Sequence, residues 1–151
     1  MTNYQRTAEW LFACGKTPTP ENLSVQLGCD IEEATEFLRE IDFDAEPDLA
    51  DRLRRIMLRA IEDLEFVATK LKRGEHRAII RDRVKALDAL CDREVTGNGV
   101  AYMAGFYKVS ADELVLNAND AKLVDGKPVI LPGGKIGKPE GWKPADLSRC
   151  V

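Results

Sequence analysis

The clearest periodicity of apolar residues lies early in the chain, where they recur at the spacing of one helix face. Thr19 followed by Pro20 is typical of a helix start, because threonine caps the first turn and proline fits within it. We predict a helix from residue 20 to about residue 41, although Gly28 costs about 1 kcal/mol relative to alanine unless close packing requires it. The residues expected to face the core are Leu23, Leu27, Ile31, Ala34 and Leu38.

Glycine and proline mark the ends of two more predicted helices. A short helix over residues 3 to 14 stops at Gly15, and a longer one begins at Pro47 and ends at Gly74. The longer helix is rich in charge and carries one apolar stripe. That stripe comprises Leu53, Ile56, Met57, Ile61, Leu64 and Val67.

The middle of the chain predicts two further helices. One runs from about residue 79 to residue 106 and contains Gly97 and Gly99, small residues that suit a tight helix contact or an approaching ligand. The other begins with Ser110 as its cap, and Glu113 completes a capping box.

After Leu123 the chain is rich in glycine, proline and lysine. The stretches "VDGK" and "LPGGK" are turn signals, which predict a short hairpin followed by an extended tail. We therefore expect an all-α fold in one domain over residues 1–151. Its helical core would span about 3–123, and an irregular C-terminal hairpin and tail would span 124–151.

Composition narrows the class of protein. The 151 residues are 44% hydrophobic and 32% charged, which is typical of a globular chain. The formal net charge of -4 argues against a stable nucleic-acid partner, because such proteins present a net basic surface. The start of the chain has no apolar signal segment, and no run of residues is long and apolar enough for a membrane helix. We expect a cytoplasmic protein.

Cysteine and histidine do not indicate a metal site of their own. Four scattered cysteines and a single histidine argue against zinc and against a disulfide framework, and favour free thiols. Oxygen ligands from aspartate and glutamate favour a hard cation such as Mg²⁺ or Mn²⁺ instead.

Acidic residues crowd two of the predicted helices. Glu32, Glu33 and Glu36 share about one turn, where like charges repel, although an ordinary solvated face would show the same pattern. Asp88 and Asp92 lie one turn apart among apolar neighbours, in a segment that we expect to be packed, and aspartate favours helices poorly. If the two helices lie side by side, the carboxylates converge, which requires either metal ions or the protonation of several carboxyl groups. Divalent cations that bind phosphates are the simplest interpretation.

Basic residues follow towards the C-terminus. Asn119 and Lys122 stand three apart at the end of the fifth predicted helix. Ammonium groups bind phosphate oxygens, but a flexible tail that carries lysines for solubility is an equally simple interpretation. The tail lysines are Lys127, Lys135, Lys138 and Lys143.

These motifs, in this order, resemble those of the MazG-like all-α NTP pyrophosphohydrolases, of the phosphoribosyl-ATP pyrophosphohydrolase-like superfamily. "EEATE" resembles the family's E-E-x-x-E motif, "DALCD" takes the place of its second acidic motif, and "NDAK" resembles the N-x-x-K of phage and bacterial members. "DGKPVILPGGKIGKPEGWKPADL" is similar to the C-terminal signature, so that the resemblance covers roughly residues 20–147. The common second motif is E-x-x-D, whereas Ala89 stands three residues before Asp92, and Asp88 has to substitute.

The resemblance implies hydrolysis of a nucleoside triphosphate between its α and β phosphates, which gives the monophosphate and pyrophosphate. It implies that Glu32, Glu33 and Glu36 form the catalytic motif, with Glu32 orienting the water or accepting its proton. Two or more Mg²⁺ ions, for which Mn²⁺ substitutes, are then held by Glu33, Glu36, Asp88 and Asp92. The substrate-binding residues are Asn119 at the sugar or base and Lys122, Lys127, Lys135 and Lys138 at the phosphates.

The resemblance also implies a homodimer or homotetramer, with the stripe from Leu53 to Val67 in its interface, and a phage-type role in nucleotide-pool control. If a phage encodes the protein, its location is the host cytoplasm. A dNTP is favoured over an NTP, with dGTP, dCTP and dUTP all open. Trp10 and Phe12 suit either stacking on a base or a place in the core. The alternative function is a non-catalytic helical module that binds or regulates another protein through its amphipathic helices.

Overall fold

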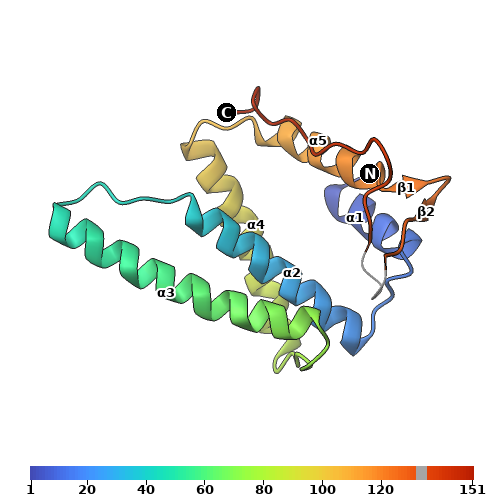
Figure 1. Cartoon of the computed structure of the whole chain (residues 1–151), viewed down its shortest axis with the longest axis horizontal. Helices are drawn as coiled ribbons and strands as arrows, with labels where there is room; N and C mark the ends of the chain where they lie inside the picture. Colours follow the sequence, from blue (N-terminus) through green and yellow to red (C-terminus); the bar gives the residue numbers. More distant parts are fainter. Residues whose placement is uncertain (132–135) are drawn as a thin grey trace. The chain divides into compact units, whose positions relative to one another are not determined.

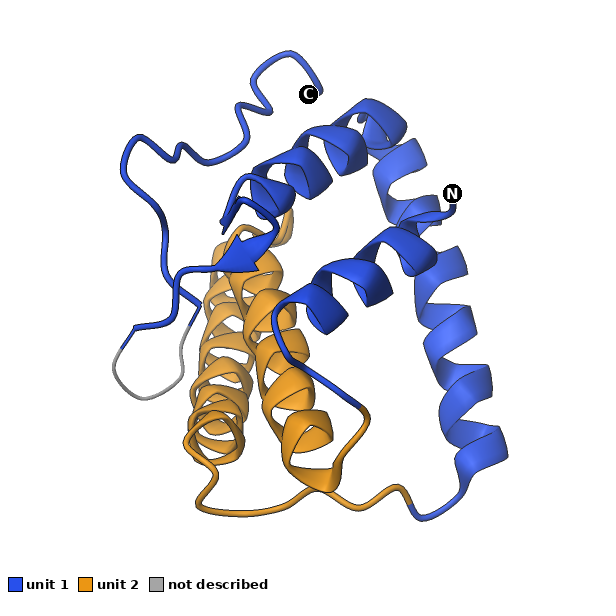
Figure 2. Ribbon diagram, turned by 90° about the vertical axis from the view of Figure 1, so that its right-hand side faces the viewer, with its two compact units in different colours: residues 1–17, 81–151 blue, residues 18–80 orange. Residues whose placement is uncertain are grey.

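The computed structural model of the chain describes residues 1–131 and 136–151 and is mostly helical, as the sequence predicts. The described part contains five helices and one two-stranded sheet (Figure 1). None of the described helices has the length and apolar character needed to cross a membrane. The chain divides into two compact units, residues 18–80 and residues 1–17 with 81–151 (Figure 2). The single domain expected from the sequence stays a prediction.

Residues 18–80 form a pair of helices, α2 (Pro20–Arg39) and α3 (Pro47–Lys72). Both begin where the sequence predicts, with proline in the first turn. The hydroxyl of Thr19 accepts a hydrogen bond from the backbone N–H of Asn22 at 3.1 Å. This bond satisfies one of the N–H groups that a helix start leaves without a helical partner.

The side of α2 that packs against α3 differs from the predicted one. Its buried residues are small, namely Ser24, Gly28 and Thr35. Leu23 and Leu27, which the periodicity places in the core, are 39% and 38% exposed. The prediction is therefore wrong for these two leucines, because small residues let the two helix backbones approach more closely than leucines do. The other predicted residues are half-buried, namely Ile31, Ala34 and Leu38.

Gly28 lies against the backbone of α3. A Cβ atom at this position would lie 2.8 Å from the carbonyl oxygen of Ala68 and 2.7 Å from Cγ of Lys72. Such distances are too short for a real side chain, so close packing requires the glycine despite its cost to helix propensity. On the facing helix the buried residues are Ala50, Ile61, Ala68 and Leu71.

In the other unit α1 (Asn3–Ala13) packs against α5 (Lys108–Asp120). Arg6 of α1 forms an ion pair with Asp120 at 2.6 Å and donates a hydrogen bond to Oδ1 of Asn117 at 2.5 Å. These contacts tie the N-terminal helix to the last turns of α5.

The fourth helix, α4 (Arg83–Met103), begins later than the sequence predicts because the carboxylate of Asp82 caps it. Asp82 accepts hydrogen bonds from the backbone N–H groups of Val84 and Lys85 at 3.0 and 3.1 Å. Aspartate is among the residues that favour this position. Of the residues in α4, Ala101 is the one that is buried.

The predicted capping box of α5 is wrong. The helix begins at Lys108, so Ser110 and Glu113 lie inside it rather than at its start. The backbone N–H of Tyr107, the N-cap residue, donates a hydrogen bond to the carbonyl of Cys150 at 2.9 Å. The start of α5 is thus held by the end of the chain, where the sequence favoured a local cap.

The C-terminal segment begins with a two-stranded antiparallel sheet, β1 (Leu123–Val124) and β2 (Lys127–Pro128). Asp125 and Gly126 connect the strands with φ angles of 51° and 72°. This left-handed conformation is the one that tight two-residue turns require, and glycine and aspartate adopt it most readily. The second predicted turn, "LPGGK", includes residues 132–135, which lie outside the described part of the chain.

Candidate functional site

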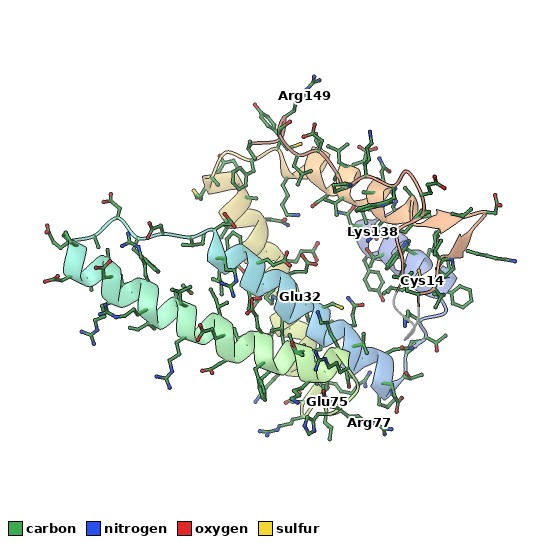
Figure 3. The ribbon with its side chains drawn as sticks, viewed as in Figure 1. Cys14, Glu32, Glu75, Arg77, Lys138 and Arg149 are labelled. Atoms are coloured by element: carbon green, nitrogen blue, oxygen red, sulfur yellow. The ribbon has the colours of Figure 1, made fainter. Side chains whose placement is uncertain are left out.

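The three glutamates of the first acidic motif lie in the second half of α2, and Glu32 contacts α3 (Figure 3). Its carboxylate forms an ion pair with the ammonium group of Lys72. By helical geometry, Glu36 lies about a quarter of a turn from the buried side of α2, and Glu33 lies nearly opposite that side. Both are exposed. The neighbouring helix therefore supplies a positive charge that the sequence around the glutamates lacks.

The second acidic pair lies on an exposed part of α4. Asp88 and Asp92 are one turn apart, and both are exposed. The expectation that they lie in a packed apolar segment is wrong for the single chain, because their neighbours Leu87 and Leu90 are 63% and 58% exposed. The two carboxylates are therefore open to solvent on successive turns.

The two acidic motifs belong to different units of the chain. Within the described residues, no three histidine, cysteine, aspartate or glutamate side chains are grouped so as to hold a metal ion. The donor type nevertheless fits a hard cation, because carboxylate oxygens are the ligands that Mg²⁺ prefers. Metal binding by Glu33, Glu36, Asp88 and Asp92 stays a prediction.

A second group of predicted site residues comes together with two tryptophans at the C-terminal end of α5. The ammonium group of Lys122 lies 5.8 Å from the ring centroid of Trp10 and 5.5 Å from that of Trp142. It also donates a hydrogen bond to Oδ1 of Asn119 at 2.8 Å. The ammonium group of Lys138 lies 4.6 Å from the ring centroid of Trp142. These five residues form the lysine–tryptophan cluster.

Hydrogen bonds hold both indole rings of the lysine–tryptophan cluster. Nε1–H of Trp10 donates to the carbonyl of Asn119 at 2.8 Å, and Nε1–H of Trp142 donates to the carbonyl of Ala118 at 2.7 Å. Both acceptors lie in the last turn of α5. The rings are half-buried, so each has its polar edge bound to α5 while part of its surface stays accessible.

The cluster contains three of the five predicted substrate-binding residues, Asn119, Lys122 and Lys138. Lys127 is exposed on β2. Lys135 lies outside the described part of the chain. The tertiary structure thus gathers the N-x-x-K residues with one lysine of the tail.

Sequence reasoning missed Trp142 altogether. The available signal was the tryptophan inside the lysine-rich stretch "GKPEGWKP", because a tail that serves only solubility does not need an aromatic residue. For Trp10 the sequence left two interpretations, a base-stacking residue and a core residue. The structure shows a half-buried ring hydrogen-bonded to the end of α5.

Positive charge also acts on a buried thiol in the same unit. Cys14, which follows α1, is 6% exposed (Figure 3). Burial raises the pKa of its thiol, and the charges of Lys16 and Lys122 oppose part of that rise. Lysines therefore gather around the end of α1 in a chain whose net charge is -4.

A groove of about 580 Å³ lies along the N-terminal part of α5, away from the lysine–tryptophan cluster. Tyr102 and Phe106 contribute to its lining, and none of the predicted site residues does. Its charged residues Lys108 and Asp112 form an ion pair with each other at 2.7 Å. Glu94 is a third charged residue of the lining, so carboxylates outnumber the lysine there. We assign the candidate chemistry to the cluster rather than to this groove, because a net acidic groove repels phosphate groups.

Comparisons of the chain with protein-family models, with curated proteins and with solved structures found no match. The residues and contacts described above are therefore the basis for any statement of function. Membership of the MazG-like family stays a prediction.

Proposed function

We propose that the protein is a metal-dependent, MazG-like (deoxy)nucleoside triphosphate pyrophosphohydrolase. The observation that carries the proposal is the lysine–tryptophan cluster, in which three residues expected to bind substrate meet at the end of α5. Phosphate oxygens bind ammonium groups, and a sugar or base binds amides and ring faces. The cluster therefore offers the types of group that a nucleotide requires.

In the proposed reaction a water molecule attacks the α-phosphorus of the nucleotide. The bond between that phosphorus and the oxygen bridging to the β-phosphate breaks, and the products are the nucleoside monophosphate and pyrophosphate. The ammonium groups of Lys122 and Lys138, with those of Lys127 and Lys135, hold phosphate oxygens, and Asn119 contacts the sugar or base.

Glu32 orients the attacking water or accepts its proton. The ion pair with Lys72 supports the orienting role, because it holds the carboxylate in one place on α2. Glu33, Glu36, Asp88 and Asp92 would hold two or more Mg²⁺ ions, or Mn²⁺ in their place. When bound, such ions activate water and neutralise charge that develops on phosphate oxygens.

The proposal includes a homodimer or homotetramer. Its support is the number of apolar side chains that the single chain leaves exposed, such as Leu87 and Val95 on α4 and Ile56 on α3, at 63%, 69% and 59%. Exposed apolar surface of this kind often marks a protein interface. Ile61, which the sequence placed in the same stripe as Ile56, is buried against α2 and is not available to a partner.

A role in control of the nucleotide pool, with dGTP or another dNTP as the substrate of a phage-type enzyme, belongs to the same proposal. The alternative is a non-catalytic module that binds or regulates another protein. The exposed apolar side chains of α4 favour it, because an interaction surface needs them as much as an oligomer does.

The decisive experiment measures pyrophosphate release from each of the eight common NTPs and dNTPs with Mg²⁺ or Mn²⁺. Wild type is compared with Glu36→Gln and with Glu62→Gln, an exposed glutamate on α3 that serves as the matched control. We expect Glu36→Gln to lower kcat/KM at least about 100-fold. Loss of a residue that only supports a metal ligand costs up to about 100-fold, and Glu36 is proposed to bind the metal itself. The control should keep the wild-type rate.

Thermal unfolding with and without Mg²⁺ completes this test. A cation that binds the folded chain better than the unfolded chain raises the melting temperature, and Glu36→Gln should reduce the rise. Absence of pyrophosphate release from all nucleotides, together with an unchanged melting temperature, would reject the enzyme and favour the non-catalytic module.

A further inference from the structure

The C-terminal segment brings Trp142 to the end of α5, where its indole is held from one side by a hydrogen bond. Nε1–H of Trp142 donates to the carbonyl of Ala118 at 2.7 Å, which fixes where the ring face lies. Farther along the segment, the carbonyl of Cys150 accepts the hydrogen bond from Tyr107 at the other end of α5. The segment is therefore attached to both ends of this helix.

Two ammonium groups share the ring of Trp142. Lys122 lies 5.5 Å and Lys138 lies 4.6 Å from its centroid, within the distance at which the negative ring face attracts a cation. Trp10 adds a second ring, 5.8 Å from the ammonium group of Lys122. Asn119 accepts a hydrogen bond from the same ammonium group at 2.8 Å. Two rings and one amide therefore contact the ammonium group of Lys122.

Positive groups that share a ring repel each other, and an anion that contacts both removes the repulsion. The two rings offset part of this cost before any anion arrives, because each attracts the ammonium group beside it. Lys16 adds a further positive charge nearby, since it and Lys122 both act on the thiol of Cys14. A chain of several linked phosphates carries charges along its length, so it can contact two separate ammonium groups at once, which suits it to this site better than a single small anion.

We propose that Trp10 and Trp142 are positioning residues that hold the ammonium groups of Lys122 and Lys138 together as a binding site for a polyphosphate chain. The choice of ligand rests on the proposed function, in which the triphosphate of a nucleotide occupies the site. The tryptophans act through the lysines: their ring faces set where the two charges lie, and the lysines contact the phosphate oxygens.

Inorganic tripolyphosphate tests the site without any hydrolysis. The chain has two tryptophans, and both belong to the cluster, so fluorescence excited at wavelengths that tyrosine does not absorb reports on this site. Titration of the full chain with tripolyphosphate in the absence of divalent metal should change the fluorescence in wild type. Isothermal titration calorimetry provides a dissociation constant that does not depend on the indoles.

Substitutions of Trp142 separate a positioning role from a structural one. Trp142→Leu removes the ring and should weaken tripolyphosphate binding about 10-fold, whereas Trp142→Phe keeps an aromatic face and should stay within about 3-fold of wild type. Lys138→Ala should weaken binding by at least as much as Trp142→Leu. Lys85→Ala on α4, which removes the same charge from an exposed site 87% open to solvent, is the matched control and should bind as wild type.

Equal binding by wild type and Trp142→Leu would overturn the positioning role, and so would equal losses in the leucine and phenylalanine variants. If Trp142→Leu does not fold, Trp142→Phe and Lys138→Ala carry the test, because Lys138 is exposed. Wild-type binding without hydrolysis of any nucleotide would reject the proposed function and support this site. No binding of tripolyphosphate by wild type, with nucleotide hydrolysis intact, would reject this site and leave the proposed function standing.

Discussion

Two long helices of the chain, α3 and α4, differ in how much of their apolar surface the single chain buries. In α3 the apolar residues Ile61, Ala68 and Leu71 are buried, and the helix is paired with α2. In α4 Ala101 alone is buried, while Leu87 is 63% exposed. Both helices carry apolar residues along their whole length, whereas charged residues continue to the end of α3 and stop at Glu94 in α4. The difference shows that an apolar residue on a helix indicates a need for burial without identifying what buries it.

The largest effect should come from truncating the buried residue of this comparison. Ile61 is 1% exposed, so Ile61→Ala should lower the free energy of unfolding by about 3 kcal/mol, through lost burial and the cavity that remains. Leu87→Ala is the counterpart on α4 and should change it by about 0.5 kcal/mol or less in the monomer, at a protein concentration too low for association, as at other exposed sites. Urea denaturation of both variants measures the difference.

A large loss in Leu87→Ala that grows with protein concentration would contradict this prediction for the single chain. It would show instead that another copy covers α4, because mass action makes the stability of an oligomer depend on concentration.

Glycine offers a second, smaller contrast between the two helix environments. Gly28→Ala places a Cβ atom 2.8 Å from the carbonyl oxygen of Ala68, which belongs to the backbone and has to move. We expect a loss of about 1–2 kcal/mol in the free energy of unfolding. Gly97→Ala on α4 meets nothing within 4 Å and should increase stability by about 0.5–1 kcal/mol through helix propensity.

Chemical denaturation of these two alanine variants provides the measurement. A lower free energy of unfolding in Gly28→Ala and a higher one in Gly97→Ala would confirm the contrast. A loss of stability in Gly97→Ala would mean that this part of α4 is in close contact with a second molecule.

The smallest effect concerns the loop that joins α2 to α3. The hydrogen bonds from Arg54, and then that from the N–H of Phe43, lower the pKa of Asp42 below its usual value of 3.8. Because the pKa of Asp42 is lower in the folded state, its ion pair with Arg54 stabilises the fold when the pH is above the unfolded-state pKa. This stabilisation is lost as the pH falls through the lower folded-state pKa. Denaturation midpoints between about pH 5 and pH 2 should therefore fall less steeply in Asp42→Asn than in wild type.

Arg54 also forms an ion pair with Asp51, at 2.8 Å, so the arginine keeps one partner in this variant. Parallel pH profiles of the variant and wild type would show that the exposed pair contributes nothing measurable, as many surface pairs do not.

Helix ends were the most predictable part of the fold, because the signals that set them are local. Thr19 caps α2 through a residue only three positions away, and Gly74 after α3 adopts a φ of 68°, which glycine tolerates best. The start of α5 was mispredicted for the converse reason. Its N-cap, Tyr107, is held by the carbonyl of Cys150, and nothing near residue 107 reveals that contact.

The candidate site shows the same division. Asn119 and Lys122 are neighbours on one turn, so their hydrogen bond follows from their spacing. Trp142 joins them only because the C-terminal segment folds back to the end of α5. The periodicity of large apolar residues also could not predict which side of α2 packs against α3. That side is built from small residues, namely Ser24, Gly28 and Thr35.

The sequence by itself determined that the chain is helical, where most of its helices begin and end, and which charged residues crowd each of them. Propensities, caps and charges act over a few residues, and the sequence displays such neighbours directly. Only the tertiary structure decided that Gly28 is pressed against α3, that Lys72 pairs with Glu32, and that two tryptophans hold Lys122. Those contacts join residues distant along the chain, and they depend on how whole helices pack.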